Sequence, residues 1–139
     1  MAQTIADVMT GNPATVERTD STAEAARRMA ASDSGDVIVL DNGTVCGILT
    51  DRDIAIRLVA QDKDPGTPVA EIVSDADLVT VAPNTSLTKA VQLIRDKAVR
   101  RLPVVQQGRV VGIVSLGDLA IERDQDSALA DVSAARGNT

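Results

Sequence analysis

The sequence contains no phenylalanine, tyrosine, tryptophan or histidine, and it has a single cysteine. Without histidine, the Ser-His-Asp and Cys-His schemes of nucleophilic catalysis are excluded. Metal sites built from histidine and cysteine are excluded as well. One cysteine cannot form a disulfide within the chain, and Cys46 lies in an apolar stretch. We therefore expect Cys46 to be a small buried hydrophobic residue.

Long apolar runs and positive charge are also scarce. No apolar run approaches the roughly 18 residues of a membrane span, and the N-terminus lacks the pattern of a secretory signal. A cytoplasmic protein without a membrane partner is expected. The net charge of −6 opposes binding to a phosphate backbone, and aromatic rings for base stacking are missing. A nucleic-acid partner is therefore not expected.

An internal repeat dominates what is present. Residues 15–58 align with residues 80–123 at a constant offset of 65 without a gap, and 12 of the 44 pairs are identical. Glycine and aspartate are among the identical positions, for example Gly47/Gly112 and Asp53/Asp118. The similarity continues upstream, where IADVM (5–9) matches VAEIV (69–73). The chain is therefore predicted to contain two copies of one unit.

The repeat divides the chain into four parts. Residues 1–61 form the first repeat, residues 62–68 a linker rich in Pro, Asp and Gly, and residues 69–124 the second repeat. Residues 125–139 are a tail that we expect to be partly disordered. A copy of about 60 residues buries little surface alone. The two copies are therefore expected to pair about a pseudo-twofold axis and share one core.

Each copy predicts the order helix–strand–helix–strand–strand–helix, an α/β (α+β) fold. Short helices are expected at about residues 3–9 and 68–73, and first strands at about 15–16 and 78–81. The next helix opens at Ser21 or Ser86. The hairpins turn at DNG (41–43) and QQG (106–108), each ending in the glycine that a tight turn favours.

The second strand of each hairpin runs directly into a helix, in GILTDRD (47–53) and GIVSLGD (112–118). A helix N-terminus presents free N–H groups and partial positive charge, which suit an anion such as phosphate. An ionised aspartate accepts hydrogen bonds only and can take both hydroxyls of a ribose. The pattern is therefore typical of a nucleoside site.

The same residues support a purely structural interpretation. A hydroxyl residue with an acid three positions later resembles a capping box, which satisfies the free N–H groups of the helix start. Thr50 with Asp53 and Ser115 with Asp118 both have this spacing. The hydroxyl can serve both purposes. The duplication, each time after an apolar strand and glycine, favours a ligand site.

Several segments in combination resemble a tandem pair of CBS domains, the module first described in cystathionine β-synthase. They are the paired G-x-x-[S/T]-x-x-D segments, RRLPVV (100–105), and PATV and DLVTV as first strands. The resemblance covers residues 3–123. It implies clefts between the repeats that bind AMP, ADP, ATP, S-adenosylmethionine or related dinucleotides. It also implies a homodimer that regulates a protein target, usually without catalysis and with no required cofactor.

The resemblance also implies roles for individual residues. Asp53 and Asp118 would hold the ribose hydroxyls, and Thr50 and Ser115 would meet ribose or phosphate. The base pocket would be lined by Thr15, Val16, Val37, Ile38, Val39, Thr80, Val81, Leu102, Pro103 and Val104. No catalytic residue and no metal ligand is implied.

The two repeats differ near these positions. Val-Ile-Val (37–39) stands where the second copy has Leu-Pro-Val (102–104), Asp36 aligns with Arg101, and Arg52 aligns with Gly117. A phosphate gains from nearby cations and loses from an acid. We hypothesise that the site with Asp118, Arg100 and Arg101 binds a phosphorylated ligand more strongly. The alternative is that the arginines are an ordinary solvated pair.

Three functions are compatible with the sequence. The first is a sensor in which an adenosine ligand shifts a dimer between arrangements that a partner protein detects. The second is a scaffold whose pockets have lost ligand binding. An enzyme is disfavoured because the hydroxyls lack a histidine partner and no P-loop lysine is present.

Overall fold

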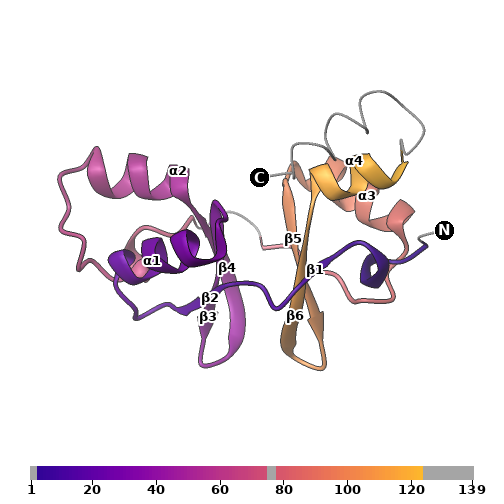
Figure 1. The fold of residues 1–139 in the computed structure, drawn as a ribbon, viewed down its shortest axis with the longest axis horizontal. Coiled ribbons are helices and arrows are strands. Elements are labelled where there is room, and N and C mark those ends of the chain that lie inside the picture. Colours follow the sequence, from indigo (N-terminus) through magenta and orange to yellow (C-terminus); the bar gives the residue numbers. More distant parts are fainter. Residues whose placement is uncertain (1–2, 75–77, 124–139) are drawn as a thin grey trace. The chain divides into compact units, whose positions relative to one another are not determined.

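The computed structural model describes residues 3–74 and 78–123, which fall into two compact units (Figure 1). Pro13–Leu78 form one unit, called here the first-repeat unit. The other unit combines Met1–Asn12 with Val79–Thr139 and is called the second-repeat unit. Each unit contains a three-stranded sheet with helices. The mixed α/β fold class predicted from the sequence is confirmed.

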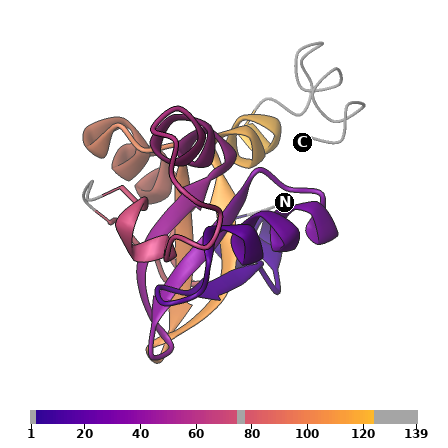
Figure 2. The same ribbon diagram turned by 90° about the vertical axis from the view of Figure 1, so that its left-hand side faces the viewer.

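The first-repeat unit has a sheet of order β2-β3-β4, with β2 parallel and β4 antiparallel to β3. Both views show α1 and α2 on the same side of this sheet, away from the β3–β4 turn (Figures 1 and 2). Its elements are β2 (Thr15–Glu17), α1 (Thr22–Ser32), β3 (Asp36–Asp41), β4 (Thr44–Thr50), α2 (Asp51–Ile54), the π-helix η2 (Ala55–Val59) and the 3-10 helix η3 (Val69–Glu71).

The second-repeat unit has a sheet of order β1-β6-β5, in which both pairings are antiparallel. Its elements are the 3-10 helix η1 (Ile5–Asp7), β1 (Thr10–Gly11), α3 (Leu87–Lys97), β5 (Arg101–Gln106), β6 (Arg109–Ser115) and α4 (Leu116–Arg123). The tail expected at residues 125–139 lies outside the described residues.

The units do not follow the repeat boundaries, because each leading 3-10 helix packs with the other repeat. The N–H group of Ile5 donates to the carbonyl of Thr85 (2.9 Å), and β1 pairs with β6. In the same way, the N–H group of Val69 donates to the carbonyl of Asp20 (2.8 Å). The predicted linker is also bound: the N–H group of Thr22 donates to the carbonyl of Thr67 (2.8 Å).

The long helices of the two units follow the same design. In α1 the buried side chains are Thr22, Ala25 and Met29, and in α3 they are Leu87, Ala90 and Ile94. This spacing of three and four residues places each set on one helix face. The predicted helix starts at Ser21 and Ser86 are confirmed. Each hydroxyl accepts a hydrogen bond from the backbone N–H three residues later, at 3.1 Å.

The hairpins turn through two residues, Asn42-Gly43 and Gln107-Gly108, all four with positive φ. This is the conformation that the right-handed twist of the strands requires in a tight turn. Each hairpin also carries a β-bulge: Val39 pairs with Gly47 and Leu40 with Val45. Cys46 is the extra residue between them, and it is exposed rather than buried as expected. A bulge interrupts the strict alternation of the strand, so the apolar neighbours of Cys46 do not determine its burial.

Among the described residues, the buried apolar side chains form two clusters, one in each unit. One cluster contains Val16, Met29, Val37, Val39 and Leu49 and belongs to the first-repeat unit. The other contains Val81, Leu87, Ile94, Leu102 and Val104 and belongs to the second-repeat unit. The 3-10 helices exchange between the repeats. The η3 segment adds Val69 and Ile72 to the first cluster, and η1 adds Ile5 to the second. Each sheet therefore has apolar cover within its own unit.

The strand expected at residues 78–81 is reduced to an isolated bridge between Val81 and Val104. Its counterpart β2 pairs over three residues, and the N–H group of Ile38 donates to the carbonyl of Ala14 (2.9 Å). Pro103 stands at the position of Ile38 in the second repeat. Because proline has no N–H, this hydrogen bond cannot form there and the parallel pairing is shortened.

Candidate functional site

Each unit has one strand–helix junction that brings predicted site residues together. The first-repeat junction consists of Thr50 at the end of β4 and Asp53 in α2, with Asp36 at the start of β3. The second-repeat junction consists of Ser115 at the end of β6 and Asp118 in α4, with Arg101 at the start of β5. In each case a tight hairpin returns the second strand to the start of the first.

Both junctions form the capping box that the spacing allowed. The carboxylate of Asp53 accepts from the N–H group of Thr50 (3.0 Å), and the hydroxyl of Thr50 accepts from the N–H group of Asp53 (3.1 Å). Ser115 and Asp118 repeat this arrangement at 2.9 and 3.1 Å. One carboxylate oxygen, Oδ2, makes the capping bond each time. An ionised carboxylate has about four acceptor positions, so capping leaves acceptor capacity for a ligand.

The other oxygen of Asp53 faces a positive charge. Oδ1 of Asp53 lies 3.9 Å from Nε of Arg57, one helical turn later. The Asp53 side chain is 19% exposed, so it is largely covered but still reachable from solvent. The carboxylate is therefore oriented by the backbone N–H of Thr50 and by the charge of Arg57.

The two junctions differ in charge. Asp36 lies directly opposite Thr50 in the β3–β4 register, whereas Arg101 lies directly opposite Ser115 in the β5–β6 register. The preceding residues occupy equivalent places too: the carbonyl of Gly35 accepts from Asp51, and that of Arg100 accepts from Leu116. An acid therefore lies beside the capping hydroxyl in the first repeat, and an arginine lies beside it in the second. Arg52, the remaining charged candidate of the first repeat, is exposed on α2.

Most of the predicted base-pocket side chains lie in the unit cores. Six of them are almost fully buried members of the two apolar clusters: Val16, Val37, Val39, Val81, Leu102 and Val104. Ile38 and Pro103 are buried but stand between two core residues in their strands, so their side chains point to the opposite sheet face. Thr15 is half-buried and Thr80 is exposed.

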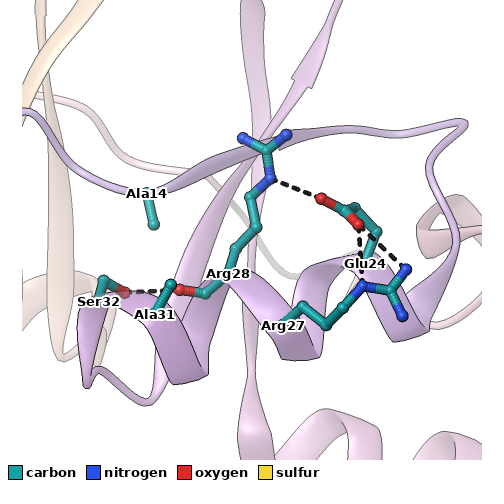
Figure 3. A pocket seen from close by; sticks show the side chains of 6 residues that line it. All are labelled: Ala14, Glu24, Arg27, Arg28, Ala31 and Ser32. Carbon is teal, nitrogen blue, oxygen red and sulfur yellow. Dashed lines mark hydrogen bonds and ion pairs between the residues drawn. The ribbon is translucent and has the colours of Figure 1, made fainter.

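A hollow on the outer side of α1 was missed by sequence reasoning. It has a volume of about 550 Å³ and is open to solvent (Figure 3). Its lining residues are Ala14, Glu24, Arg27, Arg28, Ala31 and Ser32. Hydrogen bonds hold the pKa of the Glu24 carboxyl below its ordinary value; the one from Arg28 has the larger effect and the one from Arg27 the next largest. The repeat alignment contains a signal for this hollow, because Arg28 stands where the second copy has Leu93.

A protein-family model named CBS domain matches the chain twice, over residues 5–60 and 69–123. The chain therefore belongs to the CBS domain family and contains a tandem pair of these domains. It is 44% identical over 133 residues to the CBS domain-containing protein YhcV of Bacillus subtilis, covering 93% of this chain and 94% of the relative.

Two solved structures of similar fold were determined with adenosine compounds. The structure of CBSX2 in complex with AMP has a TM-score of 0.70 and 27% identity, covering 89% of this chain and 98% of that chain. The CBS domain pair of protein MJ0100 in complex with 5′-methylthioadenosine and S-adenosyl-L-methionine has a TM-score of 0.76 and 25% identity, with the same two coverages.

No helix within residues 3–74 and 78–123 is both long enough and apolar enough to cross a membrane.

Proposed function

We propose that the protein is a regulatory sensor that binds adenosine-containing ligands such as AMP, ADP, ATP or S-adenosylmethionine. The observation that carries the proposal is the duplicated junction, in which Asp53 and Asp118 are each held by a backbone N–H at the start of a helix. A pre-oriented carboxylate can accept both hydroxyls of a ribose without first being ordered. The adenosine compounds bound by two relatives of the same fold support this ligand class.

The two junctions are proposed to differ in preference. Arg101 beside Ser115 provides a cation for a phosphate group, and Arg100 precedes it. Asp36 beside Thr50 repels the same group. Hydrogen bonds to charged groups contribute roughly 1.5–3 kcal/mol each, so one such contact separates the two affinities measurably. The second-repeat junction should therefore bind phosphorylated ligands more tightly.

Isothermal titration with AMP tests the site residues through Asp53→Asn and Asp118→Asn. Asparagine keeps an oxygen for the capping bond but loses the charge and one acceptor for ribose. We expect Asp118→Asn to remove the tighter binding event and Asp53→Asn the weaker one, with little change in the unfolding free energy of either variant. Equal losses of AMP binding in the two variants would contradict the proposed inequality.

A thermal-shift screen separates the sensor from a CBS scaffold that binds no ligand. A ligand present at 100 times its Kd stabilises the folded state by about 2.7 kcal/mol. AMP, ADP, ATP and S-adenosylmethionine are the compounds to screen, and a shift with at least one of them is expected. A flat response to all four would favour the scaffold function.

Signal output belongs to the same proposal. The sensor would act in the cytoplasm as a homodimer on a protein target, without catalysing a reaction itself. Because a ligand shifts an equilibrium only through its different affinities for the two states, the ligand should change the mass or shape of the assembly in solution. Light scattering coupled to size-exclusion chromatography, with and without AMP, measures this change. A monomer unaffected by AMP would contradict the proposed output.

A further inference from the structure

The first-repeat unit has a hydrogen-bonded bridge between α1 and β2, made by Arg28. Nη1 of Arg28 donates to the carbonyl of Thr15 (3.0 Å), and Nε of Arg28 donates to the carboxylate of Glu24 (3.2 Å). Nε of Arg27 donates to the other carboxylate oxygen of Glu24 (3.1 Å). Figure 3 shows both guanidinium groups converging on this one carboxylate. Glu24 therefore orients Arg28 towards the strand.

The Thr15 carbonyl lies at a sheet edge, since β2 is the outer strand of the order β2-β3-β4. The preceding carbonyl, that of Ala14, points inward and accepts from the N–H group of Ile38 (2.9 Å). Successive carbonyls of a strand point in opposite directions, so the Thr15 carbonyl points away from β3. Edge carbonyls have no partner in their own sheet. Arg28 supplies the partner from α1.

The second repeat fills the equivalent corner with apolar groups. Leu93 and Val79 take the places of Arg28 and Ala14, and both pack against the apolar cluster of the second-repeat unit. In the first-repeat unit, the smaller Ala14 and the outward Arg28 leave the open hollow. The Arg28 side chain is 47% exposed there. The bridge is thus specific to one repeat and accessible to solvent.

We propose that Arg28 is a positioning residue that holds the ligand-facing strand β2 in place in the first repeat only. The proposal rests on the proposed function in one respect, namely that Thr15 and Val16 face the adenosine ligand. Arg28 itself need not touch the ligand. It acts through the carbonyl of Thr15, and Glu24 acts through Arg28.

The first experiment needs no ligand. Amide hydrogen exchange at Ile38 reports the β2–β3 pairing, because this N–H donates to Ala14 next to Thr15. Arg28→Gln should accelerate this exchange by at least about threefold through local opening of the edge strand. Arg27→Gln is the matched control. Arg27 binds the same carboxylate as Arg28 but makes no hydrogen bond to β2 within the described residues, so its replacement should leave the exchange unchanged. Arg28→Lys, which retains one donor, should recover part of the protection.

The second experiment measures AMP affinity by NMR through the amide signals of Thr15 and Val16. Arg28→Gln should weaken the affinity reported there by roughly fivefold, because AMP would then have to order β2 as it binds. The affinity reported by Thr80 and Val81 should stay unchanged, because that repeat has Leu93 instead. Glu24→Gln should give an intermediate loss, and Arg27→Gln none.

The outcomes distinguish the two proposals. If AMP shifts no signal of the unaltered protein, the proposed function fails, and Ile38 exchange alone then decides whether Arg28 positions β2. Equal effects of Arg27→Gln and Arg28→Gln in both experiments would overturn the positioning role. The hydrogen bond from Arg28 to β2, which Arg27 lacks, would then make no difference. Unchanged exchange and affinity in Arg28→Gln would overturn it as well.

Discussion

The two units share a helix–strand–strand–helix segment, α1-β3-β4-α2 and α3-β5-β6-α4, but pack the segment that precedes it in different ways. In the first-repeat unit, β2 is a true strand, its edge is bound by Arg28, and a hollow remains beside Ala14. In the second-repeat unit the equivalent strand is a single bridge at Val81, and Val79 and Leu93 complete the apolar packing. A duplicated fold can therefore tolerate loss of backbone pairing where side-chain burial compensates for it.

The largest effect is expected from transferring proline between the repeats. Ile38→Pro removes the hydrogen bond to the carbonyl of Ala14 and should lower the unfolding free energy by about 2–3 kcal/mol. Urea denaturation followed by far-ultraviolet circular dichroism measures it, since the chain has no tryptophan or tyrosine for fluorescence. Stability equal to that of the unaltered protein would show that β2 pairing contributes nothing, and the contrast with Pro103 would lose its meaning.

Gly112 and Gly47 are buried glycines at aligned positions, and each lies close to a segment contributed by the other repeat. A Cβ on Gly112 would lie 2.6 Å from Sδ of Met9 and 2.9 Å from the carbonyl oxygen of Thr10, whereas on Gly47 it would lie 3.0 Å from a methyl of Val73. Backbone cannot move aside as easily as a side chain. Gly112→Ala should therefore destabilise by about 2 kcal/mol and Gly47→Ala by about 1 kcal/mol, within the usual range for overpacking. The same urea titration applies, and the reverse order would be inconsistent with the geometry of β1 on β6.

The helix ends provide a smaller, stabilising contrast. The residues that follow α1 and α3, Asp33 and Ala98, both have the left-handed conformation. Alanine adopts this conformation at a cost of roughly 1 kcal/mol, which glycine avoids. Ala98→Gly should raise the unfolding free energy by up to about 1 kcal/mol, and Asp33→Gly by less because aspartate tolerates this conformation better. Thermal denaturation of both variants checks the order, and a loss of stability in Ala98→Gly would refute it.

The smallest effect concerns protonation in the hollow. Hydrogen bonds from Arg28, and next from Arg27, keep the pKa of Glu24 below its ordinary value. A lowered folded-state pKa stabilises the folded protein above the ordinary carboxyl pKa, and this contribution is lost as the pH falls through the lowered value. An NMR titration of the Glu24 carboxyl should show its pKa rising in Arg28→Gln and rising less in Arg27→Gln. A larger rise in Arg27→Gln would show that Arg27, and not Arg28, makes the stronger hydrogen bond to Glu24.

The sequence was sufficient to predict the architecture because the signals were local and duplicated. Ser21 and Ser86 start their helices, the glycines at 43 and 108 complete the turns, and Thr50 with Asp53 forms a capping box. Each of these depends on residues within four positions of one another. The repeat confirmed each by showing it twice.

What was missed depends on contacts between distant residues. The exposure of Cys46 follows from the bulge in the β3–β4 register, which periodicity does not reveal. The shortened strand at Val81 follows from a missing N–H group on Pro103, 22 residues later. The packing of Ile5 and Val69 in the apolar cluster of the other repeat joins residues that are far apart in the sequence. Aligned positions that differ in chemistry, such as Arg28 and Leu93, were the signal in the sequence that the two repeats pack differently.

The residue opposite each capping hydroxyl is proposed to set the ligand preference of its junction. An exchange of charge, Asp36→Arg together with Arg101→Asp, tests this claim when AMP and adenosine are titrated and the amide signals of Asp53 and Asp118 are followed by NMR. In the unaltered protein AMP should shift the Asp118 signal at lower concentration, and in the exchanged protein the Asp53 signal, while adenosine shows little change. An AMP preference that stays with Asp118 in both proteins would show that residues 36 and 101 do not set it.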